Sequence, residues 1–245
     1  MPSSPSNALA AILVHGYAED SGVWSKWEPL LKHEGIPYCT VSFQDDKCGA
    51  AIDHANELSQ IVPKVKILTH QNQVNIIGHS KGGLDARVYL DQSATHDVAN
   101  LIMIGTPNAG GPVADFTVAS NLHNPLLYFP NPILCTPALF DLVTDADVTQ
   151  VRENNNTNYY TIYGDWKPSL PCRFLGSEAL GYKFLRSIGE VPNDGIVPKW
   201  SVESLTNFTN LSHTQHCHTD LLSNQESQRV YYYLKDEVVL IAVLV

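Results

Sequence analysis

The sequence predicts a single α/β domain over residues 1–245, with a mostly parallel central sheet flanked by helices. Its length suits one domain built around one hydrophobic core. Short apolar runs of strand length alternate with longer amphipathic stretches, which is the pattern of strand–helix–strand units. A composition of 44% hydrophobic and 16% charged residues is that of a folded globular protein. Such a composition does not indicate a function, so the evidence for one must come from particular residues and motifs.

Strands are expected wherever four to six consecutive residues are mostly apolar, β-branched or aromatic. Such residues fit the buried surface of a parallel sheet. In chain order the predicted strands are residues 10–14, 38–43, 74–77, 101–104 and 159–163.

Helices are expected between these strands. Residues 23–34 and 50–69 carry apolar residues at three- and four-residue spacing, as amphipathic helices do. Pro63 should kink or split the second of them. Residues 85–92 and 226–239 are the other predicted helices.

Two segments do not fit this alternation. Residues 112–149 contain five prolines and no clean period, so we expect an insertion of short helices and loops above the sheet. Its many apolar side chains suit a cap or lid over a site, and an apolar loop packed on the core is the alternative. The apolar tail at residues 238–245 is too short to span a bilayer, so it is expected to pack on the core.

Charge and targeting signals limit the partners and the location. A formal net charge of −10 argues against nucleic acid or an anionic membrane as the main partner. Residues 1–7 lack the basic flank of a secretory signal, and no cleavage site follows residues 8–14, so a cytoplasmic protein is expected unless a leader was removed. The five cysteines are odd in number and contain no CxxC pair, which favours reduced thiols.

The segment Gly78-His79-Ser80-Lys81-Gly82 fits the pattern G-x-S-x-G. A predicted strand precedes it and an amphipathic helix follows it. In that setting the glycines allow a sharp strand-to-helix turn that lifts the serine hydroxyl out of the sheet. The bland alternative is a glycine-rich turn without catalysis. We expect Ser80 to be a nucleophile and the fold to be an α/β-hydrolase fold with a small cap.

Two backbone N–H groups are expected to form an oxyanion hole. The Lys81 N–H lies at the start of the helix after Ser80, where the helix dipole favours negative charge. The second should come from the loop after the first strand, His15-Gly16-Tyr17, and the Tyr17 N–H is the candidate. The Lys81 side chain itself is expected to be solvated or locally hydrogen-bonded.

A serine nucleophile also needs a general base and a carboxylate that orients it. In this fold the chain order is Ser, acid, His. His218, at the mouth of the predicted last helix, is the best base. Two acids remain open from the residues alone: Asp194, in a tight loop, and Asp165, just after a strand end. Three acids of the 112–149 insertion, Asp141, Asp145 and Asp147, are expected to be solvated surface charges or helix caps.

Metal chemistry is not expected, because His213, His216, Cys217 and His218 are too crowded along the chain to converge readily on a tetrahedral ion.

Together these motifs resemble the microbial triacylglycerol lipase and esterase group of α/β-hydrolases. The resemblance implies that Asp194 is the triad acid, with Asp165 the runner-up, and that His218 is the base. Some members place a calcium-ligating Asp where Asp220 stands, but the other calcium ligands are not recognisable here. The motifs that carry the resemblance are His15-Gly16-Tyr17, residues 78–83, residues 105–111, residues 193–198 and His218.

The resemblance implies a carboxylic ester hydrolase, a lipase or esterase, that works through an acyl-enzyme on Ser80. No cofactor is needed, the partner is a small-molecule ester or lipid, and no stable membrane insertion is expected. A thioesterase, an amidase or a phospholipid deacylase would use the same triad. A ligand-binding relative that has lost catalysis is the alternative from another class. Chain-length preference and oligomeric state cannot be read from the motifs.

Overall fold

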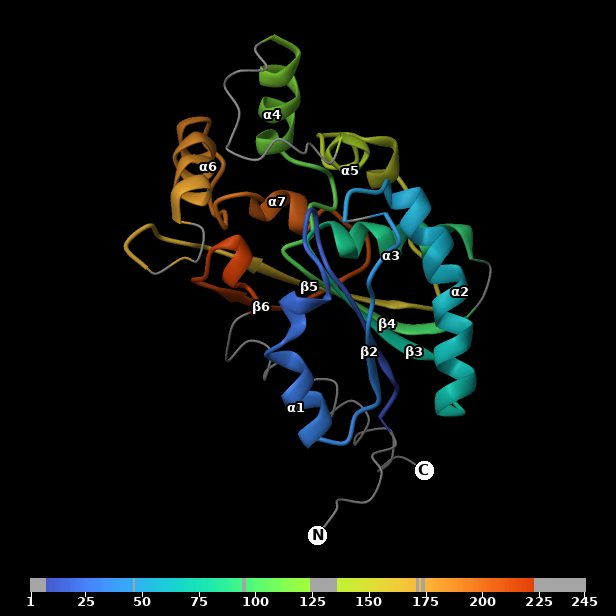
Figure 1. The fold of residues 1–245 in the computed structure, drawn as a ribbon. Coiled ribbons are helices and arrows are strands. Elements are labelled where there is room, and N and C mark those ends of the chain that lie inside the picture. The colour runs from blue at the N-terminus through green and yellow to red at the C-terminus, as the bar shows by residue number, and fades with distance from the viewer. Residues whose placement is uncertain are drawn as a thin grey trace.

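A parallel six-stranded sheet forms the centre of the computed structural model, which describes residues 8–45, 47–93, 96–123, 136–170, 172 and 175–222. The strand order is β2-β1-β3-β4-β5-β6, and each neighbouring pair is parallel (Figure 1). The predicted α/β fold class is confirmed. The strands are β1 (Ala11–Val14), β2 (Tyr38–Thr40), β3 (Val74–His79), β4 (Val98–Ile104), β5 (Asn158–Gly164) and β6 (Thr209–Thr214).

Each of the five predicted strands is present, although β2 ends at Thr40 rather than at residue 43. The sixth strand, β6, was not predicted. Its sequence, Thr-Asn-Leu-Ser-His-Thr, has no apolar run, because β6 lies at the edge of the sheet and most of its residues are at least partly exposed. An edge strand needs fewer apolar side chains than a central one, so its sequence signal is weak.

Helices connect and cover the strands. They are η1 (Ser21–Trp24), α1 (Trp27–His33), α2 (Ala51–Thr69), α3 (Lys81–Gln92), α4 (Pro112–His123), α5 (Thr136–Phe140), η2 (Asp147–Thr149), α6 (Leu175–Ser187), α7 (Lys199–Val202) and η3 (His218–Asp220).

The helix predictions differ from the structure in detail. The predicted helix at residues 23–34 is divided into η1 and α1. The expected split at Pro63 is wrong, because α2 runs unbroken through it, with Leu58, Val62 and Val65 buried along one side. This apolar contact outweighs the loss of one helical hydrogen bond. The predictions for residues 226–239 and 238–245 lie outside the described residues.

The two faces of the sheet have separate cores. Alternate strand residues point to opposite faces, so Ile12 and Ile76 pack against α2 and α3, while Leu13 and Ile77 pack with residues of η1 and α1. Burial on both faces explains why the central strands are continuously apolar. The sheet is thereby fixed firmly enough to position the loops at its carboxyl ends.

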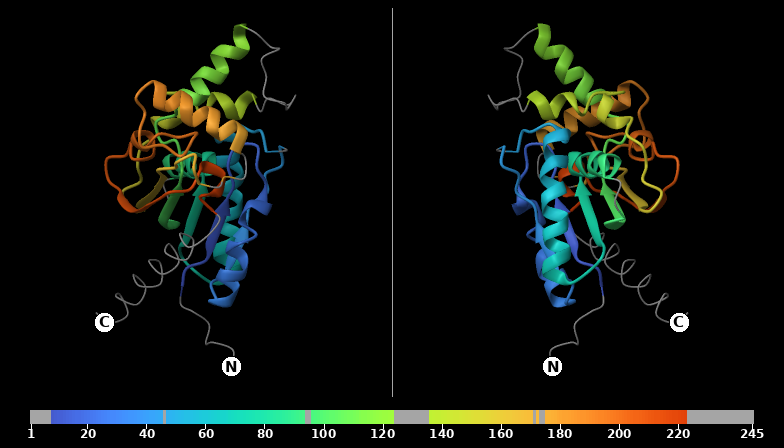
Figure 2. Two further views of the ribbon diagram at one scale, coloured as in Figure 1. Left: turned by 90° about the vertical axis from the view of Figure 1, so that its left-hand side faces the viewer. Right: turned by 90° about the vertical axis from the view of Figure 1, so that its right-hand side faces the viewer.

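The insertion at residues 112–149 contains α4, α5 and η2 in its described part. Figures 1 and 2 show α4, α5 and α6 together at one end of the molecule, beyond the sheet. The ring centroids of Phe116 on α4 and Phe184 on α6 are 5.1 Å apart, so these two helices pack on each other. Within the described ranges, no helix combines the length and the apolar character needed to cross a membrane.

The expectation of reduced thiols is wrong for three cysteines. Cys172 and Cys217 form a disulfide with their Cα atoms 5.8 Å apart, and Cys48 is also disulfide-bonded. Cys39 is a free thiol. The Cys172–Cys217 pair is separated by 45 residues, so only the fold brings the sulfurs together and a search for short CxxC spacings misses them.

Candidate active site

Ser80 occupies the turn between β3 and α3. Its backbone angles, φ 52° and ψ −126°, are strained for a residue with a side chain. The turn is possible because its neighbours are glycines: a Cβ on Gly78 would lie 2.5 Å from the Gly83 nitrogen. The Ser80 N–H donates to the Ile104 carbonyl at 2.9 Å, which ties the turn to β4. This is the geometry of a nucleophile elbow.

Ser80, His218 and Asp194 form a continuous hydrogen-bonded line. The His218 Nε2 atom lies 2.8 Å from the Ser80 hydroxyl oxygen, and Nδ1 lies 2.7 Å from Asp194 Oδ2. The other Asp194 oxygen accepts backbone N–H bonds from Ile196 and Val197 at 2.9 and 2.7 Å. Residues that are 138 and 24 positions apart are thus brought together. The carboxylate is held at a fixed angle to the imidazole.

Asp165, the runner-up acid, and His213, a histidine near His218 in the sequence, lie outside this hydrogen-bonded line. Asp165 follows β5, as expected, and its N–H donates to the Thr214 carbonyl at 2.8 Å, but the carboxylate bonded to His218 is that of Asp194. His213 stacks on the Tyr163 ring, with centroids 5.6 Å apart. The structure therefore brings together one of the two acids that the residues alone left open.

Burial and neighbouring charge act in opposite directions on His218. Burial favours the neutral imidazole and lowers its pKa. The carboxylate of Asp194 outweighs this, with smaller contributions from Glu178 and Glu19, so the net result raises the pKa of His218 to about 9. The site therefore stabilises a positive charge on this imidazole.

The loop expected to supply the second oxyanion donor lies against Ser80. A Cβ on Gly16 would be only 2.7 Å from the Ser80 Cβ, so glycine is required for this close approach. The Tyr17 backbone follows directly. On the other side of Ser80, the Lys81 N–H opens α3. Both expected amides therefore belong to segments that adjoin Ser80.

Two further residues, Glu19 and His79, support this arrangement and were not identified from the sequence. Glu19 Oε2 accepts a hydrogen bond from the Gly16 N–H at 2.8 Å and lies 2.8 Å from His79 Nδ1. The opposite ring nitrogen of His79 lies 3.1 Å from the His218 carbonyl oxygen. His79 thereby links the Gly16 loop to the backbone of His218. The sequence signal was limited to its position before Ser80 in the pentapeptide.

Glu19 is strongly biased toward its charged form. Burial alone would raise the pKa of this carboxyl, but the charge of His79 and hydrogen bonds from His79 and Gly16 lower it to about 2. Glu19 is therefore an ionised acceptor at neutral pH.

The Lys81 side chain is buried rather than solvated, which corrects one of the two expectations for it. It is 1% exposed, and its ammonium lies 2.6 Å from Asp85, 3.3 Å from His54 Nδ1 and 3.6 Å from Asp141. The contact with Asp85 is the local hydrogen bond that was the other expectation. An ammonium of this kind can be buried only because carboxylates surround it.

The same cluster extends from α3 to α2 and α5. His54 of α2 lies between Asp85 and Asp45, at 2.7 and 2.8 Å, and its ring stacks on Phe43 with centroids 3.7 Å apart. Asp141, after α5, accepts a hydrogen bond from the Ala51 N–H at 2.6 Å and so caps the start of α2. A helix cap was one of the two expectations for this acid. The other, a solvated surface charge, is wrong, because Asp141 is buried.

Glu178 and the disulfide hold the loop that carries His218. Glu178 of α6 is buried, its Oε1 accepts from the Thr219 N–H at 2.8 Å, and burial raises the pKa of its carboxyl. Among the described residues, the ligand atoms of Cys172, Glu178 and Cys217 lie within 4.8 Å of one another. The disulfide removes both sulfurs as metal ligands, so this group acts as a structural support for His218.

Comparison with known proteins identifies the family. The model of the palmitoyl protein thioesterase family matches residues 11–163, from β1 into β5. The chain belongs to the palmitoyl protein thioesterase family. The matched range includes Ser80 and the backbone of Tyr17 and Lys81, whereas Asp194 and His218 lie beyond it.

Curated relatives of this family member include lipases. It is 43% identical over 114 residues to a triacylglycerol lipase of Pseudarthrobacter phenanthrenivorans, covering 43% of this chain and 35% of that one. It is 30% identical over 147 residues to triacylglycerol lipase 2 of Saccharomyces cerevisiae, covering 58% and 44%. The chain thus spans between a third and a half of the length of these relatives.

Solved structures share the fold over nearly the whole chain. A Bacillus licheniformis lipase, BlEst2 in mature form, superposes with a TM-score of 0.77 at 22% identity, covering 95% of this chain and 94% of that one. The metagenomic carboxyl esterase MGS0156 has a TM-score of 0.71 at 17% identity, covering 96% and 78%. The predicted α/β-hydrolase fold and the resemblance to lipases and esterases are confirmed.

Proposed function

We propose that this family member is a serine hydrolase of carboxylic esters, with Ser80 as nucleophile, His218 as general base and Asp194 as the acid that orients it. The observation that carries the proposal is the unbroken line of contacts from the Ser80 hydroxyl through both nitrogens of His218 to Asp194. Its two links, 2.8 and 2.7 Å, are within the range for proton transfer and orientation.

The geometry supports a two-step acyl transfer. The Ser80 oxygen attacks the ester carbonyl carbon while its proton passes to His218 Nε2, and Asp194 stabilises the imidazolium. The Tyr17 and Lys81 N–H groups hold the oxyanion. The alcohol leaves with the proton from His218 and an acyl-enzyme remains. Water, deprotonated by His218, then releases the acid and restores Ser80. Each step uses only protein groups and water.

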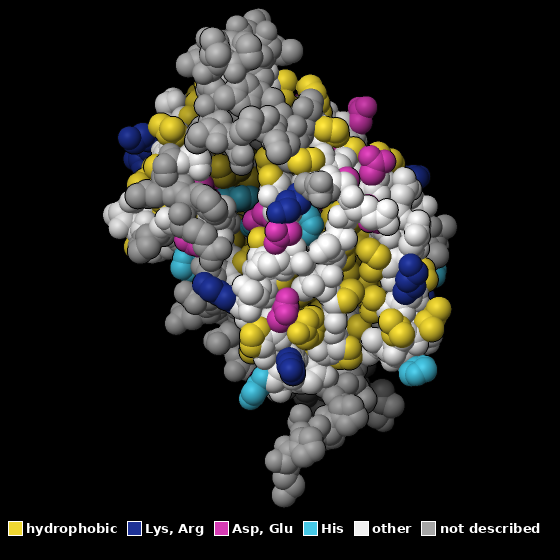
Figure 3. Space-filling model, viewed as in Figure 1, with side chains coloured by type: hydrophobic (Ala, Val, Ile, Leu, Met, Phe, Trp, Pro, Cys, Tyr) yellow, Lys and Arg dark blue, Asp and Glu magenta, His cyan; other side chains and the backbone are white. Residues whose placement is uncertain are grey.

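The helices beyond the sheet suit an acyl or lipid substrate. Phe116 on α4, Phe140 on α5 and Leu180 on α6 are 56%, 50% and 58% exposed. Figure 3 shows hydrophobic side chains around the end of the molecule that carries these helices. Exposed apolar surface of this kind is typical of a surface that meets an apolar ligand. We propose that α4 and α5 of the insertion, together with α6, form a cap that holds the acyl chain.

A thioesterase is the second candidate, and family membership favours it. A thioester carbonyl would be attacked by the same hydroxyl, and the same oxyanion donors would serve. The difference lies in the leaving group, because a thiolate departs with less help from a general acid than an alkoxide does. Loss of proton donation by His218 should therefore slow an oxygen ester more than the matching thioester.

A fluorophosphonate probe tests the catalytic proposal first. The folded wild-type protein should form a covalent adduct that maps to Ser80, and Ser80→Ala should not. A wild-type protein that stays unlabelled, although it is folded, would favour the ligand-binding alternative. Labelling at a different residue would remove Ser80 from the mechanism.

The substrate class is then measured with p-nitrophenyl esters from acetate to palmitate, beside palmitoyl-CoA and a palmitoyl amide. Higher kcat/KM for the esters supports the esterase, and higher kcat/KM for the thioester supports the second candidate. Preference for the amide would contradict both. Phe116→Ser combined with Phe140→Ser should reduce kcat/KM on palmitate more than on acetate if the cap holds the acyl chain.

A further inference from the structure

Three segments outside the proposed active site fit the pattern Asn-x-Ser/Thr, in which x is not proline. They are Asn155-Asn156-Thr157, Asn207-Phe208-Thr209 and Asn210-Leu211-Ser212. This tripeptide is the acceptor pattern for N-linked glycans. It is short and arises easily by chance, so the placement of the three asparagines decides whether it has meaning.

All three asparagines are exposed and lie near one another in the fold. Asn155 is in the loop before β5, Asn207 is in the loop before β6, and Asn210 is the second residue of β6. The two strands are parallel neighbours in which Thr161 pairs with Asn210. The three acceptors therefore lie at the same end of adjacent strands.

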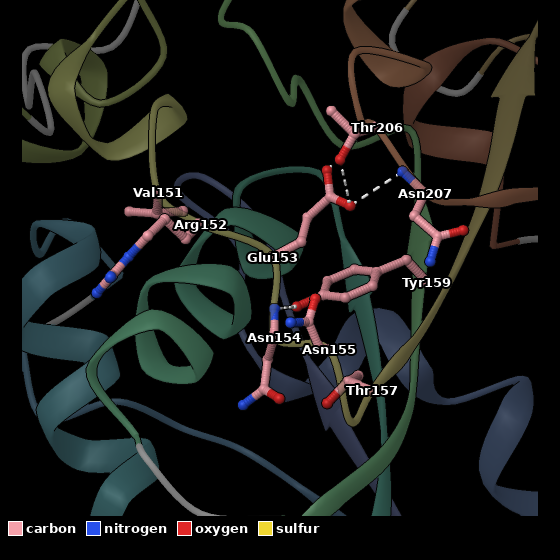
Figure 4. A pocket seen from close by; sticks show the side chains of 9 residues that line it. All are labelled: Val151, Arg152, Glu153, Asn154, Asn155, Thr157, Tyr159, Thr206 and Asn207. Atoms are coloured by element: carbon pink, nitrogen blue, oxygen red, sulfur yellow. Dashed lines mark hydrogen bonds between the residues drawn. The ribbon is translucent and has the colours of Figure 1, made fainter.

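Asn155 and Asn207 line one open hollow of about 330 Å³, seen in Figure 4. Most of its lining residues have polar side chains, and hydrogen bonds from backbone N–H groups to side chains hold its walls. Glu153 accepts hydrogen bonds from the Thr206 and Asn207 N–H groups at 2.7 and 3.0 Å. The Tyr159 hydroxyl accepts one from the Asn154 N–H at 2.8 Å. The loops are therefore fixed through their backbones while the acceptor side chains remain exposed.

The acceptors lie far from Ser80 for a topological reason. All strands of the sheet are parallel, and Ser80 follows the carboxyl end of β3. Asn155 and Asn207 precede the amino ends of β5 and β6. In a parallel sheet these amino ends lie on the side opposite to the carboxyl ends, where Ser80 is found. A glycan here would leave the site open. On β6, an edge strand, it would also hinder edge-to-edge pairing between molecules.

The disulfides provide an independent argument. Structural disulfides form and persist where the surroundings are oxidising, and such compartments are also where N-glycans meet folded or folding chains. The bond between Cys172 and Cys217 and the disulfide-bonded state of Cys48 suit that environment. Two unrelated features of the chain thus point to the same surroundings.

We propose that Asn155, Asn207 and Asn210 carry N-linked glycans and that the chain matures outside the reducing cytoplasm. In the transfer step the amide nitrogen of asparagine bonds the anomeric carbon of a lipid-linked oligosaccharide. The carbon–oxygen bond to the polyisoprenoid phosphate or pyrophosphate breaks, and that group leaves as the amide loses one proton. The sugar donor and its transferase are the only co-reactants, and no redox change occurs. The proposed location differs from the cytoplasmic one expected from the sequence.

The test is peptide mass spectrometry of the full chain isolated from its own cells, without prior reduction. The peptides that contain the three acceptors should be found with added hexose or hexosamine mass, and the Cys172–Cys217 bond should be intact. Finding all three peptides unmodified, with the disulfide formed or not, would overturn the proposal.

Variants made in the same cells assign each site. Asn155→Gln, Asn207→Gln and Asn210→Gln should each remove one glycan mass. Asn156→Gln is the matched control, because it changes an exposed neighbour and keeps the acceptor tripeptide of Asn155. Substituting Thr157 is avoided, since its hydroxyl donates to the buried Val98 carbonyl at 2.9 Å. Should an asparagine variant fail to fold, Thr209→Ala tests the Asn207 site; retention of that glycan would contradict the assignment.

Discussion

Two buried charged clusters meet at consecutive residues of the nucleophile turn. The first, the catalytic cluster, runs from Ser80 through His218 to Asp194. The second, the anchor cluster, joins Lys81 to Asp85, His54, Asp45 and Asp141. The two contacts of the first cluster, 2.7 and 2.8 Å, are matched by the shortest ones of the second, 2.6 to 2.8 Å, although Lys81 lies 3.3 Å from His54 and 3.6 Å from Asp141. The lengths of the bonds therefore do not distinguish a reactive site from a structural one.

The difference lies in how each cluster ends. In the catalytic cluster, Asp194 contacts His218 and His218 contacts Ser80, so the three side chains form one unbranched chain of hydrogen bonds. That chain ends at the Ser80 hydroxyl, which lies in a strained turn. In the anchor cluster the bonds close on themselves: Lys81 faces three partners, and His54 is held by carboxylates at both nitrogens. The chain of hydrogen bonds in the catalytic cluster leaves the Ser80 oxygen able to meet a substrate. The groups of the anchor cluster contact one another instead, and so stabilise the helices that they join.

Removing the Ser80 hydroxyl should have the largest effect on ester turnover. Ser80→Ala is expected to reduce kcat on a short p-nitrophenyl ester by roughly 10⁵-fold or more, since the other groups cannot act without the nucleophile. The melting temperature should stay within a few degrees of wild type, because the hydroxyl supports no core packing. Ester turnover within tenfold of wild type in a folded variant would remove Ser80 from the mechanism.

Replacing the acid should have the next largest effect. Asp194→Asn removes the charge that orients His218 and stabilises its protonated form, and such a change can cost about 10⁴-fold in turnover. We expect at least a loss of several hundredfold on a short-chain ester at neutral pH. Asp165→Asn is the control and should lose much less. The reverse ranking, on folded protein, would transfer the role to Asp165.

Removing the Lys81 ammonium from the anchor cluster should reduce the free energy of unfolding rather than the rate of ester hydrolysis. Lys81→Met leaves Asp85 buried without its ammonium partner, and breaking such a buried pair typically costs about 3–5 kcal/mol of unfolding free energy. Lys47→Met is the matched control, because Lys47 also lies 2.6 Å from a carboxylate, Asp20, but on the surface. An exposed pair contributes about 0–1 kcal/mol. Urea unfolding measures both; equal losses would mean that the anchor cluster is not a stabilising unit.

Glu19 tests whether the loop beside Ser80 must be fixed. Glu19→Gln keeps an acceptor for the Gly16 N–H but removes the charge that faces His79. We expect kcat to fall about tenfold with little change in KM, because a misplaced oxyanion donor affects the transition state more than substrate binding. Asp53→Asn, an exposed carboxylate on α2, is the control. An unchanged kcat for Glu19→Gln would limit Glu19 to a structural role.

The smallest expected effect is a displaced pH dependence. Esterolysis needs neutral His218, and its pKa is raised from 6.5 to about 9. The rising limb of kcat/KM should therefore have its midpoint well above pH 6.5, and Asp194→Asn should move that midpoint down. A wild-type limb centred at or below pH 6.5 would contradict the charge balance described for His218.

The same shift predicts how stability depends on pH. A group whose pKa is higher in the folded state stabilises the fold fully below its unfolded value, and the stabilisation is lost as pH rises through the folded value. For His218 that window runs from pH 6.5 to about 9. The unfolding free energy should fall across it, and His218→Gln should lack this component of the fall.

The sequence alone determined the parts of this protein that depend on local patterns. Five strands follow from apolar runs, because burial on both faces requires continuous hydrophobic side chains. The sharp strand-to-helix turn at Ser80 follows from the glycines around it, because a side chain at their positions would clash with neighbouring backbone. The histidine was narrowed to a short segment by chain order, while Asp194 and Asp165 remained equal until a resemblance favoured one of them.

Tertiary structure decided everything that depends on contacts between distant segments. It placed Asp194 rather than Asp165 at His218, paired Cys172 with Cys217, and buried Lys81 between two carboxylates, Asp85 and Asp141, and the His54 imidazole. It also added β6, whose polar sequence gives no strand signal because an edge strand is stabilised by hydrogen bonds to its neighbour more than by its own burial. The contact partners of a side chain depend on which distant segments the fold brings next to it. Local sequence patterns do not predict those contacts.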